Sequence, residues 1–290
     1  PAVQQSGSGD LELAGTVADV AISLTGSGGL TLSGGFSGGG SLLVDGTGSV
    51  VLASAATHTG GTTVSNGGLV IGDGGTAGSL AGDITNNASV IFNRSDVFTF
   101  GGVISGTGDV QHFGSGTTTL SGTNTYAGGT SILAGTLSVA SADNIGSGGL
   151  ALSLGGTLAT TGSFTTGRAI AIGVGGGTLD VADATTLTHN GGITGGETLT
   201  KTGDGALNLS GYGSGSFGNS GIVVDAGTLR FTSGNFGTNI GLTSLTVNAG
   251  ATASTVTHAM GGYFNATPSV TVNGGTFTFN NEQYLSTMSL

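Results

Sequence analysis

Short runs of alternating apolar and polar residues recur along the chain, each bounded by Gly, Asn or Ser. They are three to five residues long, rich in β-branched or aromatic side chains, and lie at 30–32, 62–64, 89–92, 97–100, 130–133, 136–140 and 269–272. A period of two is typical of half-buried strands. No stretch has the 3.6-residue apolar period and caps of an amphipathic helix. The pattern predicts an all-β chain with essentially no helix.

The runs belong to a repeated unit, G-x-G-x-apolar-x-Leu-small. Copies begin at Gly7, Gly26 and Gly46, 19 and 20 residues apart, and again at Gly114 and Gly203. Propeller blades need about 40 residues each, and sandwich strands recur about every ten residues. A coil of roughly 20 residues with three short strands fits a parallel β-helix best. We therefore predict a β-solenoid whose inward Val, Ile, Leu and Phe stack on the next coil.

Glycine accounts for 63 of the 290 residues. Gly and Asn adopt a positive φ at least cost, so they suit the sharp corners between short strands. The sequence predicts such corners at Gly60-Gly61, Asn66-Gly67, Gly128-Gly129, Asn190-Gly191 and Asn273-Gly274.

Charge is scarce and negative. Charged residues are 7% of the chain, mean hydropathy is +0.30, and four Lys and Arg against fifteen Asp and Glu give a net charge of −11. This composition predicts a folded chain rather than a disordered one. Nucleic-acid binders need a cationic stripe and binders of anionic membranes need basic clusters, so we predict neither partner.

Several other classes of protein are excluded by what the sequence lacks. Without cysteine there is no disulfide scaffold, thiolate metal site or cysteine catalysis. No apolar run reaches eighteen residues, so no membrane span is expected in the chain. Residues 1–5 lack the features of a signal peptide, and a start without Met suggests a processed or excised piece.

Catalysis by carboxylates is the main enzymatic alternative, because parallel β-helices also include polysaccharide lyases and hydrolases. Such sites need two or three carboxylates from neighbouring strands. The closest grouping is Asp180 and Asp183, with His189 six residues further on. An odd separation places Asp180 and Asp183 on opposite faces of a continuous strand, which favours a solvated strand end. Alignment of Asp180, Asp183 and Asp204 across coils would favour an enzyme instead.

The remaining motif matches lack the structural context or the ligands that a functional site would need. Residues 35–39 match G-x-S-x-G and residues 213–218 match G-x-G-x-x-G, but neither has the helix that these fingerprints require. Residues 72–75 and 203–206 offer one carboxylate each, too few for calcium. His58, His112, His189 and His258 have no zinc spacing. We predict no catalytic, cofactor or metal site.

Four aromatic residues gather near the end of the sequence: Phe264, Phe277, Phe279 and Tyr284. We expect them to stack inside terminal coils, with an exposed contact surface as the alternative.

The segment 114–137 reads GSGTTTLSGTNTYAGGTSILAGTL. It resembles the passenger-associated transport repeat of bacterial type V autotransporters, approximately G-x-G-x-L-x-L-[ST]-G-x-N-T-Y-x-G-G-T-x-[IV]-x-x-G-x-L. The matching positions are Gly114, Gly116, Leu120, Ser121, Gly122, Asn124, Thr125, Tyr126, Gly128, Gly129, Thr130, Ile132, Gly135 and Leu137. Weaker copies cover 46–69, where His58 replaces Tyr126, and 203–229, which carries a three-residue insertion. Sharing a repeat position, Tyr126 and His58 are expected to pack at corners rather than to bind ligands.

The resemblance implies a right-handed parallel β-helix on the outer surface of a Gram-negative-type cell, exported through an outer-membrane barrel. It implies a non-enzymatic adhesin, aggregation or biofilm scaffold, with the chain itself, surface glycans, or host or matrix proteins as partners. We expect transport-type repeats over 1–230 and more divergent coils over 231–290 in one continuous solenoid. The repeats begin at Gly7 and still run at 269–290 without a polar capping segment, so we expect a longer native chain or end-to-end stacking into fibres.

Overall fold

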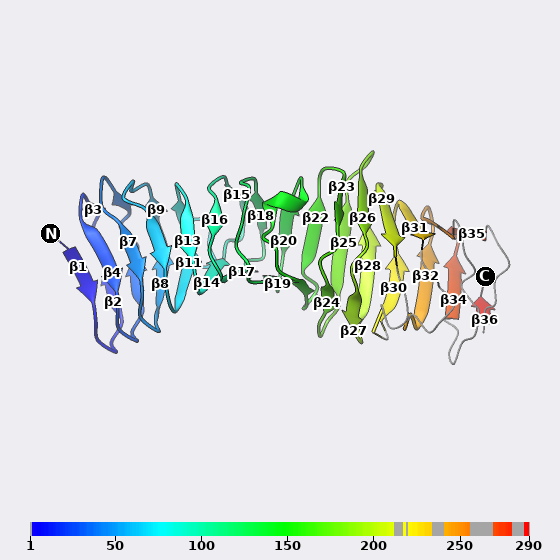
Figure 1. The fold of residues 1–290 in the computed structure, drawn as a ribbon, viewed down its shortest axis with the longest axis horizontal. Coiled ribbons are helices and arrows are strands. Elements are labelled where there is room, and N and C mark those ends of the chain that lie inside the picture. Colours follow the sequence, from blue (N-terminus) through cyan, green and yellow to red (C-terminus); the bar gives the residue numbers. More distant parts are fainter. Residues whose placement is uncertain are drawn as a thin grey trace. The chain divides into compact units, whose positions relative to one another are not determined.

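The computed structural model describes residues 2–211, 217–218, 220–233, 241–255, 269–279 and 287–289 (Figure 1). The chain is all-β, and its parallel sheets form a β-solenoid of about 12 turns with about 21 residues per turn. Among the described residues the only helical element is η1, a 3₁₀ turn over Ala142–Asn144. None of the described helical segments is long and apolar enough to cross a membrane. The predicted fold class and coil length are therefore confirmed.

Contacts divide the chain into two compact units, unit 1 (Pro1–Ser138 and Asp143–Gly148) and unit 2 (Val139–Ala142 and Gly149–Leu290). The strands that lie in unit 1, with β20 ending one residue beyond it, are β1 (Ala2–Gln5), β2 (Leu11–Leu13), β3 (Val17–Ala18), β4 (Ala21–Leu24), β5 (Leu30–Leu32), β6 (Phe36–Ser37), β7 (Leu42–Val44), β8 (Ser49–Leu52), β9 (Ala55–Ala56), β10 (Thr62–Val64), β11 (Gly68–Ile71), β12 (Ser79–Leu80), β13 (Ile84–Asn86), β14 (Ser89–Phe92), β15 (Val97–Phe100), β16 (Ile104–Ser105), β17 (Asp109–His112), β18 (Thr117–Leu120), β19 (Thr130–Ile132) and β20 (Thr136–Val139).

The strands of unit 2 are β21 (Leu150–Leu152), β22 (Thr157–Thr160), β23 (Phe164–Thr166), β24 (Ile170–Ile172), β25 (Gly177–Val181), β26 (Thr186–His189), β27 (Ile193–Gly195), β28 (Thr198–Thr202), β29 (Ala206–Ser210), β30 (Gly221–Val224), β31 (Thr228–Ser233), β32 (Ser244–Asn248), β33 (Thr252–Thr255), β34 (Ser269–Asn273), β35 (Thr276–Phe279) and β36 (Thr287–Ser289). The division at residue 230 expected from the sequence stays a prediction.

Each strand pairs in parallel with the strand one coil away. In unit 1 the rows are β1-β4-β7-β10-β13-β16, β2-β5-β8-β11-β14-β17-β19, β3-β6-β9-β12 and β15-β18-β20. In unit 2 they are β21-β24-β27, β22-β25-β28-β30-β32-β34-β36 and β23-β26-β29-β31-β33-β35. Every coil therefore serves as the pairing edge for the next.

The core consists of inward side chains stacked in register. Leu30 pairs with Val50, Val50 with Leu69, and Leu69 with Val90, and all four are buried. Their neighbours along each strand point outward, as a period of two requires. A single coil cannot bury its own apolar side chains, so this column holds the solenoid together.

The glycine corners have two physical causes. Gly67 has φ +67°, the left-handed region that the sequence predicts for Asn66-Gly67. A left-handed φ was likewise predicted for Gly128, but this prediction is wrong, because the φ of Gly128 lies outside the left-handed region. A Cβ on Gly128 would instead lie 2.4 Å from the carbonyl oxygen of Gly108, one coil earlier. At such corners glycine is required because the backbones of stacked coils touch.

Candidate functional site

The corner after β18 centres on Tyr126, which is fully buried. Its hydroxyl lies 2.7 Å from Oγ1 of Thr130, four residues later at the start of β19. Gly146 of the following coil covers the phenol ring, since a Cβ there would lie 2.5 Å from the Cδ2 atom of Tyr126. The aromatic ring is therefore sealed inside the stack with its polar end satisfied.

Asn124, two residues earlier, extends the backbone ladder with its side chain. Its Oδ1 accepts from the Ile104 N–H at 2.7 Å, and its Nδ2 donates to the Asn144 carbonyl at 2.5 Å. The side-chain amide thus carries the hydrogen-bond pattern through a corner where the chain leaves strand geometry. This gives a structural reason for Asn at this motif position.

In the copy over 46–69 the imidazole of His58 takes the place of the phenol. Nε2 of His58 lies 2.9 Å from Oγ1 of Thr62, again four residues later. The ring stacks on Phe36 with centroids 4.2 Å apart. Burial lowers the pKa of His58 below its usual value, so the ring is neutral near pH 7.

In the third copy, which carries a three-residue insertion, Phe217 lies at the corresponding corner, before β30. Phe217 is fully buried and meets Phe231 edge to face, with centroids 6.5 Å apart. Neither member of this pair carries a hydroxyl. Apolar rings pack this third corner, whereas the other two copies pair a polar ring with a threonine.

The other motif residues lie at positions that suit a role in packing. Leu120, Ile132 and Leu137 are buried in the core. Gly114, Gly116, Gly122, Gly128 and Gly135 lie at corners against the backbone of the preceding coil. The carbonyl oxygen of Gly129 accepts a hydrogen bond from the Val110 N–H at 3.0 Å. Their structural role is consistent with this placement and stays a prediction until variants are measured.

The carboxylates considered for catalysis do not form one group. Asp180 lies on β25 and accepts from Oγ1 of Thr202 at 3.2 Å. Asp183 is exposed in the following turn and binds the Ala184 N–H at 2.7 Å. His189 is fully buried on β26, with Nε2 2.8 Å from the carbonyl oxygen of Arg168. These side chains serve separate structural contacts.

Asp180 and Asp204 instead flank a buried lysine. Lys201 points inward from β28 and donates from Nζ to the carbonyl oxygens of Thr202, Gly203 and Ala226 at 2.6, 2.7 and 3.1 Å. Burial lowers the pKa of Lys201 to about 8, against the opposing effect of Asp180 and Asp204. Three backbone acceptors occupy the ammonium, which suits a structural cation better than a nucleophile.

Sequence reasoning did not find this role for Lys201. The sequence feature that could have revealed the buried lysine is the alternation in TLTKT (198–202). Leu199 points inward, so Lys201, two residues later on the same strand, must point inward as well.

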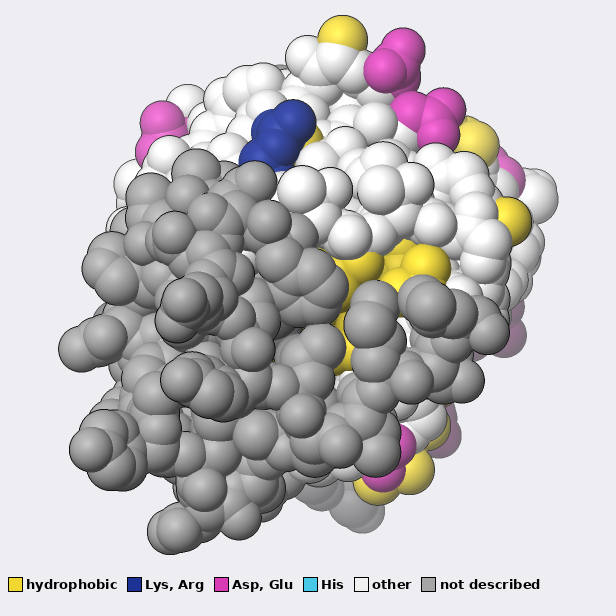
Figure 2. Space-filling model, turned by 90° about the vertical axis from the view of Figure 1, so that its right-hand side faces the viewer, with side chains coloured by type: hydrophobic (Ala, Val, Ile, Leu, Met, Phe, Trp, Pro, Cys, Tyr) yellow, Lys and Arg dark blue, Asp and Glu magenta, His cyan; other side chains and the backbone are white. Residues whose placement is uncertain are grey.

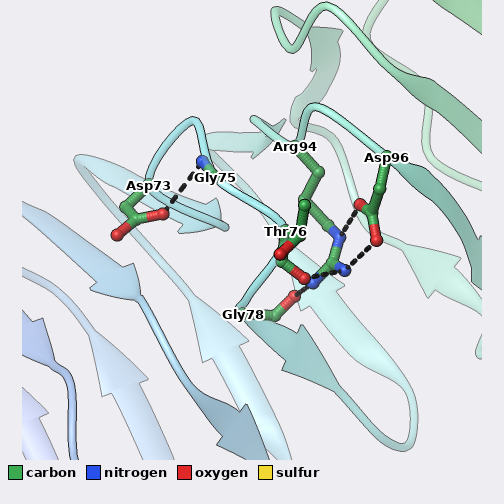
Figure 3. A network of polar contacts seen from close by, with 6 residues as sticks. All are labelled: Asp73, Gly75, Thr76, Gly78, Arg94 and Asp96. Carbon is green, nitrogen blue, oxygen red and sulfur yellow. Dashed lines mark hydrogen bonds and ion pairs between the residues drawn. The ribbon is translucent and has the colours of Figure 1, made fainter.

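Arg94 forms a second buried cation site, this one in unit 1 (Figure 3). Its Nε and Nη2 atoms bind both carboxylate oxygens of Asp96, at 2.9 and 2.8 Å. The remaining guanidinium hydrogens reach the carbonyl oxygens of Thr76 and Gly78, and the guanidinium lies over the Phe98 ring, 4.8 Å from its centroid. These contacts hold the loop between β11 and β12 against the next coil.

The chance motifs have no chemical context in the structure. Ser37, in the G-x-S-x-G match, lies on the two-residue strand β6, and the chain continues to β7 without a helix. Of the G-x-G-x-x-G match, Gly213, Ser214, Gly215 and Ser216 lie outside the described residues. No group of three His, Cys, Asp or Glu that could hold a metal occurs in the described part of the chain. Of the four C-terminal aromatics, Phe264 and Tyr284 also lie outside it, and Phe277 is half-buried.

The outward strand positions carry hydroxyl groups at the coil spacing. In unit 2 Thr157, Thr178 and Thr200 stand in register on β22, β25 and β28. In unit 1 Thr117 pairs with Thr136 in the same way. Figure 2 shows acidic side chains as separate patches among uncharged polar atoms on the face that it presents. These outward threonines make the strand faces polar, and charged residues are only 7% of the chain.

Comparison with known proteins agrees with this arrangement. The family model of the passenger-associated-transport-repeat matches residues 42–71, 113–139 and 199–231, the same three regions that the sequence indicates. The adhesin BmaC autotransporter of Brucella suis biovar 1 (strain 1330) is 51% identical over 49 residues, which are 17% of this chain and 1% of that protein. No solved structure matches the chain. The resemblance is thus confirmed: the chain carries passenger-associated transport repeats, as autotransporter passengers do.

Proposed function

We propose that this repeat-bearing chain is a non-enzymatic β-solenoid segment of an exported bacterial surface adhesin. The observation that carries the proposal is the match of three separate regions to the passenger repeat, together with a relative that is named an adhesin. The matched part is a small fraction of that relative, so adhesion by this chain is an inference from a local likeness. The hydroxyl-bearing, weakly negative outer face supports a display surface that stays soluble.

Surface display tests this function directly. Cells that present the whole chain on an outer-membrane barrel are compared with cells that present the barrel alone, on surfaces coated with glycans or matrix proteins. We expect several-fold higher retention of cells that carry the chain. Equal retention on every surface would contradict the adhesive role.

The enzymatic alternative has a separate test. We expect the purified chain, and its Asp180→Asn and Asp183→Asn variants, to leave a panel of polysaccharides uncleaved. Cleavage by the wild-type chain that either variant abolishes would replace the adhesin proposal with a carbohydrate-active enzyme.

Self-association into fibres, as a biofilm scaffold, is the finer form of the proposal. Successive coils pair edge to edge in parallel, so any coil edge is complementary to another coil of the same kind. Light scattering over a concentration series is expected to show mass increasing with concentration. A constant monomer mass at all concentrations would remove this part while leaving adhesion intact.

A further inference from the structure

A hollow of about 470 Å³ lies on the surface of unit 2, at the corners that lead into β25 and β28 (Figure 1). Its volume falls within the range of about 300–1,000 Å³ that binding pockets occupy. The lining consists of Thr178, Glu197, Thr198 and Thr200, together with glycines of the two preceding corners. Glu197 and Thr198 are exposed and the other two are half-buried, so solvent reaches all four residues.

The hollow results from corners of unequal length. The residues that pair across the three coils are Leu152, Ile172 and Gly195 before the corners, and Thr157, Thr178 and Thr200 after them. The middle corner, 173–177, therefore has five residues, whereas 153–156 and 196–199 on either side have four each. Among the described residues, no atom lies within 4 Å of a Cβ built on Gly155 or Gly196. The longer corner is thus left uncovered by its neighbours.

Two exposed aliphatic side chains stand beside the hollow. Leu154 is 65% exposed and Val174 is 74% exposed, and they directly precede Gly155 and Gly175 of the lining. The N–H of Leu154 donates to the carbonyl oxygen of Val174 at 2.8 Å, so the two residues are neighbours across adjacent coils. They are the only large apolar side chains exposed in the described part of unit 2. Exposed apolar surface beside a hollow is typical of a contact site.

Leu154 also has an unfavourable backbone conformation. The Gly156 N–H donates to the Ser153 carbonyl oxygen at 2.9 Å, which closes a turn with Leu154 (φ +53°) and Gly155 (φ +79°) at its centre. Gly, Asn and Asp suit such positions, whereas a bulky side chain is disfavoured there. Leucine at this place gains neither burial nor a favourable turn. Because conformations of this kind concentrate at binding sites, Leu154 is a candidate contact residue.

We propose that this hollow binds a basic segment of another protein. An Arg or Lys side chain of that segment enters the hollow beside Glu197, while its aliphatic neighbours cover Leu154 and Val174. The proposal deepens the adhesive function above and rests on it for its biological role, although not for the binding itself. It narrows the expected partners to proteins.

The charge of the lining selects a cation. Glu197 is the only charged residue in the lining, and its carboxylate has no ion-pair partner among the described residues. The hydroxyls of Thr178, Thr198 and Thr200 make no hydrogen bond within that same part of the chain, so they can accept from an ammonium or guanidinium group. Lys and Arg also carry methylene stems that cover apolar surface. A net charge of −11 attracts such a segment to the chain.

A second copy of the chain fits the hollow less well. Each copy carries a net charge of −11, so two copies repel one another. Of the four basic residues, Arg94 and Lys201 are buried and Arg168 is half-buried, which leaves Arg230 as the only exposed cation that a copy could offer. We therefore assign the occupant to a different protein.

The test uses the purified full chain, labelled with ¹⁵N and titrated with the capped peptide Gly-Leu-Arg-Leu-Gly and with versions that carry Lys or Gln in place of Arg. We expect saturable shifts of the Gly155, Gly175 and Glu197 amides with the Arg and Lys peptides, with a dissociation constant of about 1 mM. The Gln peptide cannot pair with the Glu197 carboxylate and should bind about threefold more weakly.

Leu154→Asn places a residue that this turn favours but removes the aliphatic side chain. We expect it to fold at least as stably as wild type and to bind the Arg peptide about fivefold more weakly, a combination that a purely structural leucine would not give. Glu197→Gln should remove the preference for the Arg peptide over the Gln peptide. Val97→Asn changes a residue in unit 1 that is 77% exposed, and as the matched control it should bind like wild type.

The site is overturned if neither basic peptide shifts these amides at about 10 mM, or if Leu154→Asn and Glu197→Gln both bind like wild type. Equal affinity of the wild-type chain for the Arg and Gln peptides would overturn the choice of a basic partner. Dimerisation in light scattering that Leu154→Asn abolishes would assign the hollow to a second copy instead. Peptide binding without adhesion by displaying cells would overturn the adhesive function alone, whereas adhesion that survives in both variants would overturn only this site.

Discussion

His58 and Tyr126 hold the same position in two repeats that lie 68 residues apart, and each bonds a threonine four residues later. Tyr126 is covered by Gly146 of the next coil, whereas His58 faces a corner two residues shorter than its own. The motif therefore fixes the shape of one corner, and the adjoining coil decides whether that corner is sealed or open. The same repeat position is therefore covered in one repeat and lies beside open space in the other.

The covering glycines give the largest expected difference between the two corners. A Cβ on Gly146 would lie 2.1 Å from the carbonyl oxygen of Tyr126, so Gly146→Ala should lower the free energy of unfolding by about 3 kcal/mol or more. Gly82→Ala meets open space and bears only the cost of φ +91°, about 1–2 kcal/mol. Urea denaturation of both variants measures the difference. Equal losses would mean that the two corners are equally packed.

The hydroxyl pairs give the next largest effect. Tyr126→Phe leaves the buried Oγ1 of Thr130 without the phenol and should cost about 1–2 kcal/mol in the free energy of unfolding. Adding Thr130→Val removes the stranded polar atom. The double variant should therefore recover part of the loss in urea denaturation. A double variant less stable than Tyr126→Phe would show that the threonine serves another contact.

These corners show which structural features the sequence could predict and which it could not. The strands 30–32, 62–64, 89–92 and 97–100 were predictable to the residue, because alternation and the flanking glycines act locally. The equivalence of Tyr126 and His58 was predictable from the gapless 68-residue alignment. The open space beside the His58 corner was not predictable, because it depends on how many residues the next coil uses at its own corner, and no local pattern reveals that register.

The contacts of the two buried cations, Lys201 and Arg94, could likewise not be predicted from local sequence patterns. Lys201 lies at an inward position in an alternating strand, which the sequence reveals, but its three carbonyl acceptors come partly from Ala226, one coil later. Arg94 likewise binds the carbonyls of a loop about 16 residues earlier. Contacts between coils require the stacking register, which the structure supplies.

The titration of His58 gives the smallest expected effect. Burial lowers the pKa values of His58, His112 and His189 below 6.5, so the folded state favours their neutral forms. The unfolded chain then binds more protons, so stability is present above pH 6.5 and is lost as the pH falls through the folded pKa values.

His58→Tyr copies the second repeat and removes one of these three contributions. We expect it to be within about 1 kcal/mol of wild type at pH 7.5 and to lose less stability than wild type between pH 7.5 and 5.0 in urea denaturation. An unchanged loss would mean that His58 is already accessible to protons in the folded state.

The most direct test of the contrast between the two corners is a crystal structure of the chain. The account predicts open space beside Gly61 and Gly82 at the His58 corner, and a Tyr126 corner closed by Gly146. A His58 corner sealed by residues 81–83 would contradict it.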